Sequence, residues 1–68
     1  MSDSKVGKVL IANRLRDYKV EVLDENPFSY ELEVWVDGFP SYRVVYMKTM
    51  LLDHMISEEL SILAIQYG

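Results

Sequence analysis

Few residues of this chain have side chains suited to catalysis or metal binding. Among its 68 residues there is no cysteine and one histidine, His54. A Ser-His-Asp triad would need His54 as its base, and the adjacent Asp53 could not orient it, because neighbouring residues on a helix do not face each other. His54 and Glu58 are four residues apart, as two metal ligands on a helix would be, but zinc takes four ligands and no others are evident. We therefore expect no enzymatic activity, no metal and no cofactor.

Aromatic and acidic residues in the middle of the chain are better candidates for a binding site. Glu31, Glu33 and Trp35 alternate along one face of an expected strand. Glu31 and Glu33 could resemble a glycosidase carboxylate pair, but a solvated acidic face is the preferred interpretation. Trp35 is either covered by the chain's own helix or available to a partner, and tryptophan is enriched at the energetic centres of interfaces. The predicted partner-binding residues are Trp35, Phe39, Tyr42, Glu31 and Glu33.

Alternation of apolar and polar residues predicts the strands that would position these side chains. The clearest strand covers 29–36, with Tyr30, Leu32, Val34 and Val36 on its core face. Asp37-Gly38 favours a type I′ hairpin turn, although Pro40 also permits a longer, bulged connection. Further strands are expected at 18–23 and 41–47, and residues 8–12 fit either a strand or a helix.

The C-terminal third fits a helix over 49–60, with Thr49 as its cap. Residues 61–67 either continue this helix or form a closing strand. The expected fold is α+β: a small antiparallel β-meander of three to five strands, packed with one helix in the C-terminal third. Residues 1–68 would form a single domain, with 1–4 as a frayed terminus.

Small size and high apolar content together favour self-association. The sequence is 50% hydrophobic and has no disulfide to staple it, and domains this small often need metals, disulfides or oligomers to be stable. A homo-oligomer is therefore expected, with a dimer favoured. Its seam would use Met50, Leu51, Met55 and Ile56, although a single core of helix on sheet would account for these residues equally well.

Charge is unevenly distributed along the chain, which has a net charge of −4. The charged residues sum to +3 in residues 1–19 (five cations, two acids) and to −7 in residues 20–68 (two cations, nine acids). Pairing of opposite charges on neighbouring strands is one explanation. An acidic surface that meets a basic partner is the other.

We expect a non-catalytic protein-binding module, a regulator or inhibitor that docks on another protein. Alternatives are an acidic mimic of nucleic acid, a self-assembling structural subunit, and a small nucleic-acid binder that uses the basic residues of 5–19. Nucleic acid is a poor candidate because the acidic body repels phosphate. Neither a signal-peptide core nor a membrane span is evident, so we expect no membrane association and a cytoplasmic location.

Overall fold

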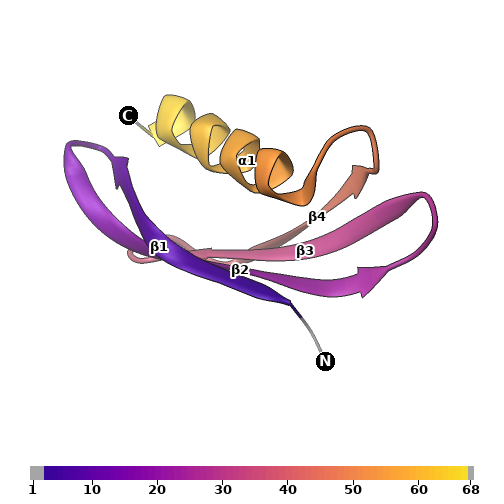
Figure 1. The fold of residues 1–68 in the computed structure, drawn as a ribbon. Helices are drawn as coiled ribbons and strands as arrows, with labels where there is room; N and C mark the ends of the chain where they lie inside the picture. Colours follow the sequence, from indigo (N-terminus) through magenta and orange to yellow (C-terminus); the bar gives the residue numbers. More distant parts are fainter. Residues whose placement is uncertain (1–2, 68) are drawn as a thin grey trace.

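The computed structural model describes residues 3–67, which form one antiparallel sheet and one helix. Along the chain the elements are β1 (Ser4–Ile11), β2 (Arg14–Glu25), β3 (Ser29–Val36), β4 (Tyr42–Met47) and α1 (Leu52–Tyr67). The strand order in the sheet is β1-β2-β3-β4, so each strand pairs with its neighbour in sequence. Figure 1 shows α1 lying across one side of the curved sheet, while no described element covers the other side. The predicted α+β meander with a C-terminal helix is confirmed.

The core lies between α1 and the sheet face that it covers. The predicted strand 29–36 and its core face are confirmed, since Leu32, Val34 and Val36 are almost fully buried. Removing such side chains from water is the main favourable contribution to folding. The other buried apolar residues are Ile11, Tyr18, Val20, Met55, Ile56, Leu60 and Leu63.

The first hairpin closes through a two-residue turn at Ala12 and Asn13. Both residues have positive φ, 54° and 60°, which is the type I′ pattern that matches the twist of paired strands. Residues 8–12 are therefore mostly strand. The strand starts earlier than expected, because Ser4 pairs with Glu21 and the Asp3 carbonyl accepts a hydrogen bond from Val22. Met1 and Ser2, part of the terminus expected to fray, lie outside the described residues.

The connection between β3 and β4 differs from the predicted type I′ turn. Gly38 has φ 90°, but Asp37 does not have positive φ, and the Phe39 amide donates to the Val36 carbonyl at 3.0 Å. Positive φ at the third residue of such a turn is the type II pattern. The chain then continues to Tyr42 before it pairs with β3 again, so the longer connection suggested by Pro40 is the one that forms.

The helix begins and ends later than predicted. Thr49 is not its cap: the Thr49 amide donates to the Met47 carbonyl, and the Leu51 carbonyl accepts the first helical hydrogen bonds. Residues 61–67 continue the helix rather than forming a strand. The buried positions Leu60 and Leu63 extend the apolar stripe of the preceding turn, so the same face stays on the sheet. Within residues 3–67, no helix has the length and apolar character needed to cross a lipid bilayer.

Candidate functional site

The sheet surface that faces away from α1, termed the outer sheet face, includes Trp35 near the end of β3. Val6, Lys19 and Trp35 are directly paired neighbours across β1, β2 and β3. Trp35 is 43% exposed and Val6 is 69% exposed, so both apolar side chains are in contact with solvent. A hollow of about 420 Å³ lies beside them. The chain's own helix therefore does not cover Trp35.

Opposite charges alternate on the outer sheet face. Glu33 pairs with Arg43 of β4, with 3.6 Å between the carboxylate and the guanidinium nitrogen. Lys8 and Asp17 face each other across β1 and β2 at 2.8 Å. The Asp17 carboxylate is a hydrogen-bond acceptor and a negative charge for Lys8, and for both reasons the pKa of Lys8 is raised. Charge pairing between neighbouring strands, one of the two predicted explanations, is thus present.

Apolar side chains continue across this face beyond Trp35. Glu31, the second predicted acid, pairs with Val45, which is 64% exposed. The face is therefore a mixture of apolar side chains and charges of both signs rather than an acidic surface. Its other exposed apolar residues include Leu10, Leu15 and Met47.

Tyr42 and Phe39 do not belong to the outer sheet face, which corrects their grouping with Trp35. Tyr42 pairs with Val34, a core residue, and so points towards α1. The predicted two-residue turn would instead have placed Tyr42 opposite Glu33, on the same face as Trp35. A shift of one residue in register moves every side chain of a strand to the other face.

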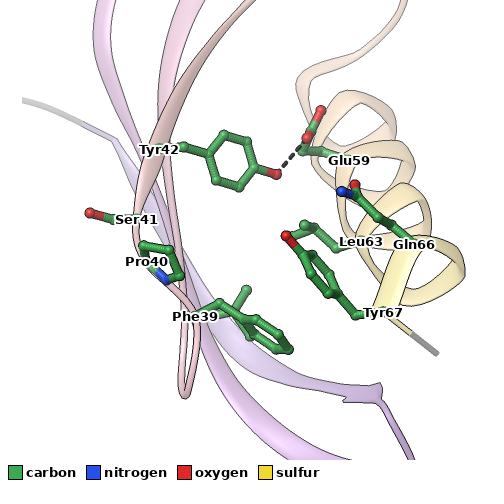
Figure 2. A pocket seen from close by; sticks show the side chains of 9 residues that line it. Phe39, Pro40, Ser41, Tyr42, Glu59, Leu63, Gln66 and Tyr67 are labelled. Carbon is green, nitrogen blue, oxygen red and sulfur yellow. Dashed lines mark hydrogen bonds between the residues drawn. The ribbon is translucent and has the colours of Figure 1, made fainter.

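Phe39 and Tyr42 line a cavity of about 330 Å³ near the C-terminal end of α1, termed the helix-end cavity. Figure 2 shows the Tyr42 ring reaching from the sheet towards the helix, with the Phe39 and Tyr67 rings close together. The centroids of these two rings are 4.7 Å apart. Arg16 lies over the Phe39 ring at 4.8 Å and donates to the Asp37 carbonyl, which holds this connection against β2. The cavity is lined by Val36, Phe39, Pro40, Ser41, Tyr42, Glu59, Leu63, Gln66 and Tyr67.

A buried carboxylate, that of Glu59, lines this cavity from the side of α1. Glu59 is 8% exposed, and its two oxygens accept hydrogen bonds from the Tyr42 and Tyr46 hydroxyls, both at 2.5 Å. Burial of the two tyrosines raises their pKa values, and the hydrogen bonds to Glu59 and its negative charge raise them further. These hydroxyls therefore stay protonated at neutral pH and act as donors.

Sequence reasoning did not identify Glu59, although a signal was present. Glu59 falls within the apolar stripe of α1, since Met55, Ile56, Leu60 and Leu63 are buried on the same side. An acid at such a position indicates a buried carboxylate that needs hydrogen-bond donors.

The predicted self-association residues do not form one surface. Met55 and Ile56 are buried in the chain's own core, at 0% and 3% exposure. Met50 and Leu51, just before the helix, are 39% and 73% exposed. A dimer seam through all four residues is therefore wrong, because two of them already pack against the sheet.

The basic residues of 5–19 are distributed over both sides of the sheet. Lys5 pairs with Asp53 of the helix at 3.6 Å, and Arg14 lies 4.0 Å from Asp37. Lys8 is also paired with an acid, and the two remaining cations are on opposite faces, Arg16 on the side of α1 and Lys19 on the outer sheet face. Among residues 3–67 there is also no group of three or more histidine, aspartate or glutamate side chains that could hold a metal ion.

Comparison with protein-family models, with curated proteins and with solved structures finds no match for this chain. The proposals below therefore depend on the geometry and chemistry of its own residues.

Proposed function

We propose that this protein is a non-catalytic protein-binding module that docks on another protein through the outer sheet face. The main support is Trp35, which is 43% exposed on the face opposite the helix and is surrounded by apolar and charged neighbours. Large aromatic residues at the centre of a binding surface contribute much of its affinity. By occupying a surface of its partner, the module would act as a regulator or inhibitor.

The charges of the outer sheet face favour a protein partner over nucleic acid. Arg43 and Lys8 are paired with acids of the same face, so acidic and basic groups alternate there. An acidic mimic of nucleic acid would need a face of one sign to compete for a phosphate-binding groove. A phosphate-binding protein would need a basic face instead. A partner surface with apolar patches and charges of both signs complements this face best.

The tyrosines beside Glu59 support a non-catalytic role. Their raised pKa values keep the hydroxyls of Tyr42 and Tyr46 protonated near neutral pH, so neither is available as a general base. A second copy of this chain is the alternative occupant of the outer sheet face, because that face itself has exposed apolar side chains and charges of both signs. The cytoplasmic location expected from the sequence remains part of this proposal.

The only tryptophan of the chain allows docking to be followed directly. Proteins captured from native lysate on the immobilised chain would be purified and titrated against it in solution, while Trp35 emission is recorded. We expect the emission to shift to shorter wavelength as the indole leaves water. Trp35→Ala, measured by calorimetry, should weaken binding about tenfold or more.

Two further variants test the location of the interface. Val6→Ser, which keeps the tryptophan, should weaken the same complex, whereas Ile65→Ser on the exposed side of α1 should not. Equal affinity of Trp35→Ala and the unmodified chain would overturn the proposal. If Trp35 emission changes with protein concentration in the absence of a partner, self-assembly through the outer sheet face would replace the proposed docking. If duplex DNA displaces this chain from its partner, and binding to that partner depends on Glu31 and Glu33 but not on Trp35, nucleic-acid mimicry would replace the proposed docking.

A further inference from the structure

Three aromatic rings and one buried carboxylate line the helix-end cavity. The rings belong to Phe39, Tyr42 and Tyr67, and the carboxylate belongs to Glu59. The volume of about 330 Å³ is at the lower end of the range found for small-ligand pockets. We propose that this cavity binds an alkylated ammonium group, independently of the outer sheet face.

The charge of the cavity favours a cation. Glu59 is more than nine-tenths buried, and no basic side chain of the described residues forms an ion pair with it. Its known partners are two neutral hydroxyls, which donate hydrogen bonds but do not neutralise its charge. A buried charge is costly unless an opposite charge is close. A cation in the cavity would offset this cost, whereas an anion would be repelled.

The helix adds to the negative potential of the same cavity. Gln66 and Tyr67 of the last turn line it, and this turn contains no basic residue. Unpaired carbonyl groups give the C-terminal end of a helix a partial negative charge. Both the helix end and Glu59 therefore favour positive charge at this point.

The hydrogen bonds of Glu59 favour an alkylated ammonium over a primary one. Each carboxylate oxygen already accepts a short hydrogen bond from a tyrosine, which leaves the negative charge but fewer positions for new donors. A primary ammonium has three N–H donors that need acceptors, whereas a quaternary ammonium has none. Aromatic faces attract such cations through the ring quadrupole. Arg16 already lies over the Phe39 ring, so Tyr42 and Tyr67 are the rings left to contact a ligand.

Choline and its neutral carbon analogue 3,3-dimethyl-1-butanol form a matched pair of probes. We expect choline to shift the ring-proton NMR signals of Tyr42 and Tyr67 saturably, with a Kd about tenfold below that of the neutral analogue. Glu59→Gln should reduce the preference for choline over the neutral analogue, because it removes the buried charge and leaves the rings and the helix end in place. Tyr67→Leu should weaken choline binding, and Trp35→Phe, an aromatic change on the outer sheet face, should leave it unchanged.

Equal binding of choline and the neutral analogue would overturn the proposal, as would equal loss of choline binding in Trp35→Phe and Tyr67→Leu. If Glu59→Gln does not fold, Tyr67→Leu serves as the test of the proposal. Tyr67 is 46% exposed and belongs to the last turn of the helix, so its replacement should leave the protein folded. Nα-acetyl-trimethyllysine amide represents a trimethylated lysine side chain within a peptide, whereas choline represents a free small molecule. Tighter binding of this compound than of choline would indicate a side chain on a peptide, and tighter binding of choline would indicate a free small molecule.

Discussion

Gly7 lies directly beneath the ring of Tyr18, its paired neighbour on β2. A Cβ atom at Gly7 would lie 2.8 Å from the Tyr18 Cε2 atom, closer than real Cβ contacts allow. Tyr18 is 9% exposed and belongs to the core, so its rigid ring has little room to move. The ring covers the backbone of a strand glycine that would otherwise weaken the sheet.

Gly7→Ala should lower the free energy of unfolding by about 1–3 kcal/mol, as overpacking of a core typically does. Urea denaturation would measure this change. In a Tyr18→Val background the same substitution should be neutral or stabilising, because the clash is gone and alanine restricts the unfolded chain. An equal loss in both backgrounds would show that the ring is not the cause.

The Tyr42–Glu59 hydrogen bond should contribute measurably to stability. Tyr42→Phe leaves one oxygen of a buried carboxylate without its donor, so we expect a loss of about 1–3 kcal/mol in the free energy of unfolding. A double-mutant cycle with Glu59→Gln should show that the two effects are coupled. Tyr67→Phe is the control, because no described residue is hydrogen-bonded to the Tyr67 hydroxyl. Additive losses in the cycle would contradict the hydrogen bond.

Stability should fall as the pH rises above about 10, the ordinary pKa of tyrosine. The pKa values of Tyr42 and Tyr46 are raised in the folded state by burial and by Glu59. Above the unfolded pKa the unfolded chain therefore releases protons that the folded chain retains, which favours unfolding. Below that pH this contribution to stability is fully present.

An alkaline titration would test the predicted loss of stability, with tyrosinate absorbance as the measure of ionisation and circular dichroism as the measure of folding. At least two of the five tyrosines should ionise only together with unfolding. Ionisation of all five near their ordinary pKa while the fold persists would contradict the prediction.

The two faces of β3 should respond differently to truncation. Leu32→Ala removes a fully buried side chain and should cost about 2–5 kcal/mol in the free energy of unfolding. Trp35→Ala should cost less than Leu32→Ala, because 43% of Trp35 is exposed on the uncovered side of the sheet. Thermal or urea unfolding of both variants would measure the difference. A large loss in Trp35→Ala would mean that another part of the chain covers this ring.

Local pattern in the sequence was enough to predict strands at 18–23, 29–36 and 41–47 and a helix in the C-terminal third, whereas residues 8–12 fitted either a strand or a helix. The alternation at 29–36 specified both the strand and its buried side, because a strand has a period of two and one face of a sheet must leave water. The helical spacing of Leu52, Met55 and Ile56 specified a helix in the C-terminal third. Residues 61–67 could not be assigned from their own pattern, since a short apolar run fits either a strand or a helix.

Only the tertiary structure decided which side chains from different elements share a surface. Trp35 and Tyr42 are on opposite faces because the β3–β4 connection is longer than a two-residue turn, and this changes the register by one residue. The pairing of Glu59 with Tyr42 joins residues 17 apart in sequence, and it depends on how α1 crosses the sheet. Periodicity describes one element at a time, whereas a site between two elements depends on turn geometry and packing.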